Sequence, residues 1–194
     1  MPLKLQSSGG GSVTLDVPST ASTFTATVPA NNGTLVTTGS TAAVTQGMLA
    51  SGVAGNGPAF SASLGSNQTL SNGVATKLNL NLEAFDTNNR YDTSLYRFTP
   101  NVAGYYFVTG RAVIPGSNYQ MVMIYKNGGV VKDGVQGEAT NAPYGVTVSG
   151  LVYLNGSTDF IELYAVQFAS GGGSATANAG EAACFFDAFM ARAA

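Results

Sequence analysis

Hydrophobic residues make up 44% of this 194-residue chain, which is enough apolar material for a folded core. Charged residues make up only 9%, against about 25% in typical soluble domains, with no histidine, one cysteine and a net charge of −2. This composition argues against nucleic-acid binding, a disulfide framework, a cysteine-rich zinc site and most enzyme classes, so we expect no catalytic activity and no cofactor.

Membrane insertion and export are not expected either. The longest apolar stretches are four or five residues, far short of the about 18 needed to cross a bilayer. The N-terminal residues after Lys4 run into Ser, Gly and Thr without the apolar segment of a signal peptide. We therefore expect the protein to act, or to be assembled, where it is made.

Residues 1–57 are predicted to form an extended, β-rich N-terminal arm that ends in a hinge. Period-two alternation between residues 13 and 17, and again between residues 24 and 28, is typical of half-buried strands. Two such runs are too small to fold alone, so we expect the arm to become ordered by packing on partner chains. A flexible Ser/Gly linker is the alternative. No charged residue occurs between Asp16 and Lys77, which suits a segment that partner chains desolvate.

From Pro58 onward the sequence predicts dense β-structure. Segments rich in Val, Ile, Phe and Tyr alternate with short turn signals. Eight or more short strands at this spacing predict an all-β antiparallel sandwich or jelly roll over residues 58–194. The clearest expected strands are 96–99, 104–114, 119–126, 144–154, 160–168 and 182–190.

Two Asn-Gly dipeptides in this region are expected to form hairpin turns. Asn and Gly accept the positive φ angles of a type I′ turn more readily than other residues do. Asn127-Gly128 and Asn155-Gly156 both lie between apolar runs of strand length. Each dipeptide therefore predicts two antiparallel strands that are neighbours in one sheet.

The expected strand at 104–114 is apolar on both faces. Tyr106 and Val108 share one face, and Tyr105 and Phe107 share the other. A strand that is apolar on both sides is usually covered on both sides. In an antiparallel protein the second cover is often a neighbouring subunit, so this strand predicts an assembly of several copies.

A series of motifs in the head follows the order and spacing of a known domain. They lie at residues 58–64 (PAFSASL), 89–93 (NRYDT), 96–106 (YRFTPNVAGYY), 126–128 (KNG), 149–159 (SGLVYLNGSTD) and 183–190 (ACFFDAFM). Together they resemble the C1q/TNF-like jelly-roll domain over about residues 58–192. The departures are Gly110, where that family tends to have an aromatic residue, and Thr158, which intrudes before Asp159. The resemblance implies a homotrimer whose subunits meet along a three-fold axis through apolar and aromatic strand faces.

The arm carries a second resemblance. Residues 12–18 (SVTLDVP), 24–29 (FTATVP) and 33–39 (GTLVTTG) are similar to a segment of tail-fibre and other fibre-like structural proteins of tailed bacteriophages. Such proteins join a virion-attaching arm to a trimeric C-terminal knob. A collagen-like stalk is not expected, because the arm lacks a Gly at every third position.

Glu83, Asp86 and Asp92 form the one carboxylate cluster of the sequence. The loop from Asp86 to Asp92 faintly resembles a calcium-binding loop, but Tyr91 replaces the required Gly and the closing Glu is missing. We favour a polar turn whose Asp and Asn side chains bond the local backbone. Calcium at the trimer apex, which some members of the resembled family bind, is the alternative.

Three tyrosines are candidates for contact with a receptor. Tyr91, Tyr119 and Tyr144 each lie beside turn residues, where an exposed ring could stack on a sugar. A loop tyrosine more often anchors its own loop, and that alternative is favoured. Cys184 lies in a segment that is expected to be a buried strand, so we expect a packed thiol rather than a reactive one.

These features predict a non-enzymatic structural protein of a tailed-phage virion, assembled in the host cytoplasm. The chain would be a trimeric fibre or knob. Its arm, residues 1–57, would attach to other virion proteins, and its head, residues 58–194, would face a host-surface glycan or protein. A capsid decoration protein, or head fibre, is the first alternative. A soluble carbohydrate-binding module is the second.

Overall fold

The computed structural model of the chain describes residues 3–6, 8–15, 57–134, 137–138 and 145–194. The chain divides into two compact units, Met1–Thr41 and Ala42–Ala194. None of the helices among the described residues is long and apolar enough to cross a membrane.

The described part of the first unit is an antiparallel hairpin. It consists of β1 (Leu3–Gln6) and β2 (Ser12–Leu15), joined by a turn in which Gly10 has a φ of +86°. β2 confirms the first strand predicted in the arm. The second predicted strand, at 24–28, and the hinge before residue 57 lie outside the described residues.

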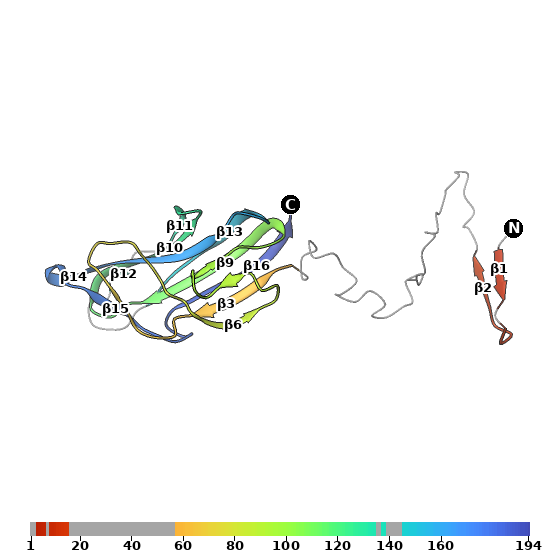
Figure 1. Cartoon of the computed structure of the whole chain (residues 1–194), viewed down its shortest axis with the longest axis horizontal. Coiled ribbons are helices and arrows are strands. Elements are labelled where there is room, and N and C mark those ends of the chain that lie inside the picture. The colour runs from red at the N-terminus through yellow and green to blue at the C-terminus, as the bar shows by residue number, and fades with distance from the viewer. Residues whose placement is uncertain (1–2, 7, 16–56, 135–136, 139–144) are drawn as a thin grey trace. The chain divides into compact units, whose positions relative to one another are not determined.

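The head, from residue 57 onward, is an antiparallel sandwich of two main sheets (Figure 1). The first sheet has the strand order β13-β9-β16-β3-β6, and every neighbouring pair is antiparallel. Its strands are β13 (Gly145–Asn155), β9 (Ala103–Val113), β16 (Phe185–Ala193), β3 (Ala59–Ser63) and β6 (Leu82–Asp86).

The second sheet has the order β11-β10-β14-β8-β7, with β12 paired to β10 and β5 paired to β14. Its strands are β11 (Gly129–Asp133), β10 (Ser117–Lys126), β14 (Ile161–Ala169), β8 (Arg97–Phe98), β7 (Tyr91–Asp92), β12 (Gly137–Glu138) and β5 (Thr76–Lys77). A small pair, β15 (Ala175–Ala177) with β4 (Gln68–Leu70), forms a separate two-stranded sheet. The predicted all-β jelly roll is confirmed, and each of the six clearest strands expected in the head is present within three residues of its predicted ends.

Aromatic side chains join the two sheets in the core. The ring of Phe60, on β3, stacks on Tyr91 and Phe98 of the opposite sheet, with centroids 4.7 and 4.5 Å apart. Phe186 and Tyr106, on β16 and β9, meet this stack edge-on, at 5.2 Å from Phe60 and 5.8 Å from Phe98. Each of these side chains is at most 7% exposed, so strand alternation directs one apolar face of each sheet into a shared core. Cys184 is fully buried in the same core, as predicted, and burial raises the pKa of its thiol.

The two Asn-Gly dipeptides have different structures. Asn127-Gly128 forms the predicted hairpin turn between β10 and β11, with φ angles of +53° and +81°. Asn155-Gly156 does not form a hairpin, because β13 pairs with β9 whereas β14 pairs with β10. It begins a loop that crosses from one sheet to the other, and the side-chain oxygen of Asn155 accepts hydrogen bonds from the backbone N–H groups of residues 157–159. The expectation of a second hairpin is therefore corrected.

Gly110, where the resembled family tends to have an aromatic residue, faces Leu163 across the core. A Cβ at Gly110 would lie 2.4 Å from Leu163 Cδ1, so the leucine fills the space that a larger side chain would need. The other departure, Thr158, accepts a hydrogen bond from the Asn155 amide at 2.9 Å and so belongs to the crossing loop. Both departures are therefore accommodated by local packing.

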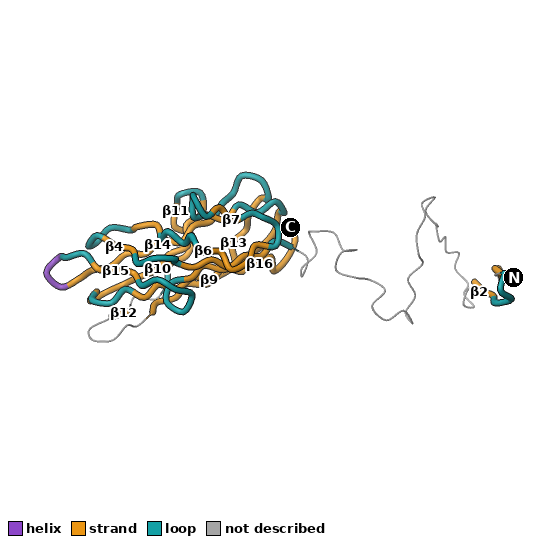
Figure 2. Tube along the Cα trace, turned by 60° about the horizontal axis from the view of Figure 1, so that its bottom comes forward, coloured by secondary structure: helices purple, strands orange, loops and turns teal. Residues whose placement is uncertain are grey.

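The chain enters and leaves the head at the same end, which we call the base. The backbone N–H of Met190 donates to Pro58 at 3.1 Å, and that of Ala194 donates to Ala103 at 3.2 Å. Ala103 also pairs with Asn155, the last residue of β13. The short helix η2 (Ser170–Gly172) lies at the opposite tip of the head, away from the C-terminus (Figure 2).

Candidate functional site

The outer surface of the first sheet carries exposed aromatic and aliphatic side chains, which we call the apolar face. Its members come from the adjoining strands β13, β9 and β16 and are between 37% and 54% exposed. They are Tyr105, Phe107, Leu151, Tyr153 and Phe189. The rings of Tyr105 and Tyr153 are 5.5 Å apart, and those of Phe107 and Phe189 are 5.7 Å apart. The prediction that β9 is apolar on both faces is confirmed.

Farther from the base, the same surface of the sheet becomes polar. Asp187 Oδ1 and Arg111 Nε are buried and have no hydrogen-bond partner among the described residues. Burial raises the pKa of the Asp187 carboxyl, although a hydrogen bond with the Ser61 side chain acts in the opposite direction. Buried polar atoms usually have partners, and these two have none among the described residues of a single chain.

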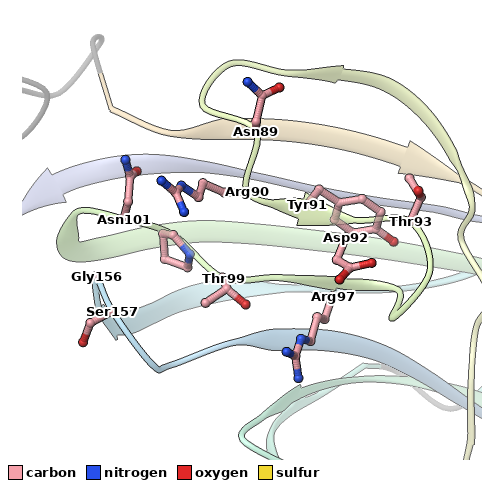
Figure 3. A pocket seen from close by; sticks show the side chains of 11 residues that line it. Asn89, Arg90, Tyr91, Asp92, Thr93, Arg97, Thr99, Asn101, Gly156 and Ser157 are labelled. Carbon is pink, nitrogen blue, oxygen red and sulfur yellow. The ribbon is translucent and has the colours of Figure 1, made fainter.

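The β7–β8 hairpin forms the floor of a polar pocket. Tyr91 and Phe98 are opposite each other in this hairpin, and both are buried in the core. Because side chains alternate along a strand, the neighbours of these two residues point away from the core. Those neighbours are Arg90, Asp92, Arg97 and Thr99. Figure 3 shows Arg90 and Arg97 separated by Thr99.

Loops at the base complete the pocket, which has a volume of about 650 Å³. Residues 89–93 and 99–101 form most of its lining, and Gly156 and Ser157 of the crossing loop close one side. Gly156 has a φ of +71°, and a Cβ there would lie 2.3 Å from the backbone nitrogen of Ala103. Glycine is therefore required for the crossing loop to approach the backbone of Val102 and Ala103 so closely.

Hydrogen bonds and charge fix the polar groups of the pocket. Asp92 Oδ1 accepts hydrogen bonds from the N–H and hydroxyl of Ser94 and from the N–H of Leu95, at 2.8, 2.6 and 2.9 Å. These bonds, with a smaller contribution from the charge of Arg97, hold the pKa of the Asp92 carboxyl below its ordinary value. The guanidinium carbon of Arg97 lies 4.7 Å from the centre of the Phe160 ring, which restricts its orientation.

Two members of the predicted carboxylate cluster, Asp86 and Asp92, form turns, whereas Glu83 lies exposed in β6. Asp86 accepts hydrogen bonds from the backbone N–H groups of Asn88, Arg90 and Tyr91, and Asp92 caps the next turn. The favoured interpretation, a polar turn bonded to its own backbone, is confirmed. In the described ranges, no group of three or more His, Cys, Asp or Glu side chains is placed to hold a metal ion.

The three candidate tyrosines lie in different surroundings. Tyr91 is 7% exposed, its ring stacks on Phe60, and its hydroxyl donates to the carbonyl of Leu80 at 2.8 Å. It is therefore a core residue, and the expectation that it is an exposed loop ring is corrected. Tyr119 lies within β10 and is 42% exposed, so its contact with a receptor stays a prediction. Tyr144 lies outside the described residues.

The sequence analysis did not identify Arg90 and Arg97 as members of a site. A usable signal was present, because a buried aromatic residue stands beside each arginine in two short consecutive runs, NRYDT and YRFTP. That signal places the arginines on one outward surface. It does not show that residues 99–101 and 156–157 come together beside them.

No protein-family model and no curated protein sequence matches the chain. Solved structures do match the head. Murine APRIL is 9% identical, with a TM-score of 0.53, over 69% of this chain and 98% of that chain. The globular domain of zebrafish complement 1qA protein is 18% identical, with a TM-score of 0.46, over 71% and 99%. The PRD1 vertex protein P5 is 14% identical, with a TM-score of 0.47, over 69% and 96%.

At 9% identity, the likeness to murine APRIL shows a common fold and nothing about activity. It agrees with the strand order and the antiparallel pairing of the two sheets. The head therefore has the C1q/TNF-like jelly-roll fold.

Proposed function

We propose that the chain is a non-enzymatic structural protein of a tailed-phage virion, a homotrimeric fibre or knob that adheres to the host surface. The observation that carries the proposal is the apolar face. Contiguous exposed apolar surface on a soluble domain marks a site of contact with another protein, a ligand or a membrane. The C1q/TNF-like fold and the apolar outer surface of β9 favour other copies of this chain as the partner.

The unpartnered polar atoms on the same sheet surface support this choice of partner. Arg111 and Asp187 carry opposite charges on neighbouring strands, yet no ion pair joins them within the chain. Contact between copies would let the arginine of one subunit meet the carboxylate of the next, which removes the cost of two buried polar atoms without partners. The apolar face would supply most of the association energy, and the charged pair would fix the register.

The virion assignment rests on the sequence of the arm. Its Thr-rich motifs, which carry a single charge at Asp16, are similar to those of phage fibre proteins, and such a segment suits packing between partner chains. In this proposal the arm attaches the trimer to other virion proteins in the assembled particle, and the head projects from it. No chemical step is assigned to any residue.

Light scattering on the full-length chain at micromolar concentration tests self-association. We expect a particle with three times the 19.7 kDa mass of one chain. A particle of 19.7 kDa, or of twice that mass, would contradict the trimer. Deletion of residues 1–50 should leave the head trimeric and abolish incorporation into particles; incorporation that survives the deletion would contradict the role of the arm.

A capsid decoration protein is the second candidate within this class, and the same apolar face and arm serve it. Imaging of assembled particles separates the two, because a fibre adds density at the tail and a decoration protein adds density on the shell. A soluble carbohydrate-binding module is the third candidate. It predicts a chain that binds sugars and neither trimerises nor enters particles.

A further inference from the structure

We propose that the pocket on the β7–β8 hairpin binds an anionic saccharide, that is, a sugar bearing a carboxylate or phosphate group. The proposal names a ligand class for the adhesive role of the head. It rests on the groups that line the pocket and does not depend on self-association through the apolar face. The two proposals can therefore fail separately.

The lining of the pocket is positively charged. Two of the chain's eight basic residues, Arg90 and Arg97, line it together with one carboxylate, Asp92, so the lining carries a net charge of +1. The chain as a whole carries −2. Within the described part of the chain neither guanidinium forms an ion pair with a carboxylate, whereas Lys77 and Lys126 both do. The planar donors of two arginines are therefore available to a ligand, and they match the geometry of a carboxylate or phosphate.

Contacts within the chain hold parts of the pocket in place before a ligand binds. Arg97 lies over the ring of Phe160, and its partner across the hairpin, Asp92, is held by the turn at Ser94. The backbone at Arg90 is held by the hydrogen bond that the N–H of Thr99 donates to its carbonyl, at 2.9 Å. A ligand that meets fixed donors loses less entropy on binding than one that must order them.

Hydrogen-bonding groups beside the arginines favour a saccharide over a bare anion. Hydrogen bonds to Asp92 from the described residues all end on Oδ1, which leaves Oδ2 as an acceptor beside the arginines. A bare anion is repelled by this carboxylate, whereas a sugar hydroxyl donates to it. Asn101 and Ser157, on the opposite side, add amide and hydroxyl groups that both donate and accept. A volume of about 650 Å³ is in the usual range for small-molecule sites and accommodates more than one sugar unit.

Titration calorimetry or ligand-observed NMR on the full chain tests the proposal with four simple probes. These are glucuronate, glucose 6-phosphate, glucose and inorganic phosphate, each at millimolar concentration. We expect glucuronate, glucose 6-phosphate or both to bind about tenfold or more tightly than glucose and inorganic phosphate. Tighter binding of glucuronate would identify the anionic group of the ligand as a carboxylate, and tighter binding of glucose 6-phosphate would identify it as a phosphate. No binding of either acid, equal binding of glucose, or equal binding of inorganic phosphate would overturn the proposal.

Substitutions locate the binding. Arg90→Gln and Arg97→Gln should each weaken binding of the preferred acid about tenfold or more. Arg192→Gln is the matched control, because Arg192 is exposed, lies outside the pocket and has the same charge. The Arg90 side chain is exposed, so Arg90→Gln tests the site even if Arg97→Gln disturbs the hairpin. An equal loss of affinity in the Arg192 variant, or none in the Arg90 variant, would refute the location.

Discussion

Replacement of Phe189 by alanine is a direct test of whether other copies of the chain cover the apolar face. Phe189 lies on β16, beside the β9 members of this face, with its ring 5.7 Å from that of Phe107, and it is 52% exposed in a single chain. The side chain is not part of the core, so its removal leaves the fold of one head intact. We expect the variant to fold and to form weaker trimers.

The size of the effect follows from the exposed area. An aromatic side chain has about 200 Å² of surface, so the 52% that is exposed corresponds to about 100 Å². At about 25 cal/mol per Å², covering this area contributes about 2.5 kcal/mol, and alanine retains a small part of it. The loss is then about 2 kcal/mol per subunit and about 6 kcal/mol per trimer, or about four powers of ten in the dissociation constant. Because this constant scales with the square of concentration, the half-dissociation point rises about a hundredfold.

Mass measurement over a dilution series gives that half-dissociation point for each variant. Phe168→Ala is the matched control, because Phe168 is 44% exposed but lies on β14 in the other sheet. Circular dichroism checks that both variants keep the β-fold. The reasoning is refuted if Phe189→Ala dissociates at the same concentration as the unaltered chain, or if Phe168→Ala shifts the point equally.

Three further predictions concern the stability of the head. Gly110→Ala should lower the free energy of unfolding by about 2 kcal/mol in urea titrations, because the new Cβ would lie 2.4 Å from Leu163; an unchanged midpoint would contradict this packing. Burial raises the pKa of Tyr106 to about 12, whereas the unfolded residue ionises near pH 10, so stability is intact below about pH 10 and falls as the pH rises to about 12. Tyr106→Phe should reduce that slope. Hydrogen bonds from Lys126 and Asn127 lower the pKa of Asp159, so its stabilisation is present above about pH 4 and is lost as the pH falls; unfolding of Asp159→Asn at several pH values should show a weaker acid dependence.

The strands of the head were predictable because their chemistry is local. Alternation along β9 places Tyr106 and Val108 in the core and Tyr105 and Phe107 outside, as the sequence alone indicates. The pairing of strands is not local in the same way. Asn127-Gly128 and Asn155-Gly156 are the same dipeptide with the same preference for positive φ, but only the first joins neighbours in one sheet. Which sheet a strand joins depends on the packing of all the others.

The polar pocket was only partly predictable for the same reason. The turn chemistry of Asp86 and Asp92 was foreseen, because each carboxylate bonds to backbone groups within five residues. The favoured alternative, a tyrosine that anchors its own loop, foresaw only that Tyr91 would be packed, since its position beside turn residues gave no indication of the Phe60 ring that stacks on it from a strand about 30 residues away. The side of the pocket formed by Gly156 comes from still farther along the chain.

The shared end at which the chain enters and leaves the head determines how tension is carried. A pull transmitted along the backbone from residue 57 acts first on β3, which is hydrogen-bonded to β16 on one side and β6 on the other. When β3 is pulled along its axis, its hydrogen bonds to β16 and to β6 are loaded in shear. Many hydrogen bonds then resist the force together, instead of breaking one after another. Loops near the pocket lie at the same end, beside Ala103. Force between a ligand bound in the pocket and the start of β3 would therefore pass only through the base of the head. Substitutions at the far tip, around η2, would then leave the strength of this attachment unchanged.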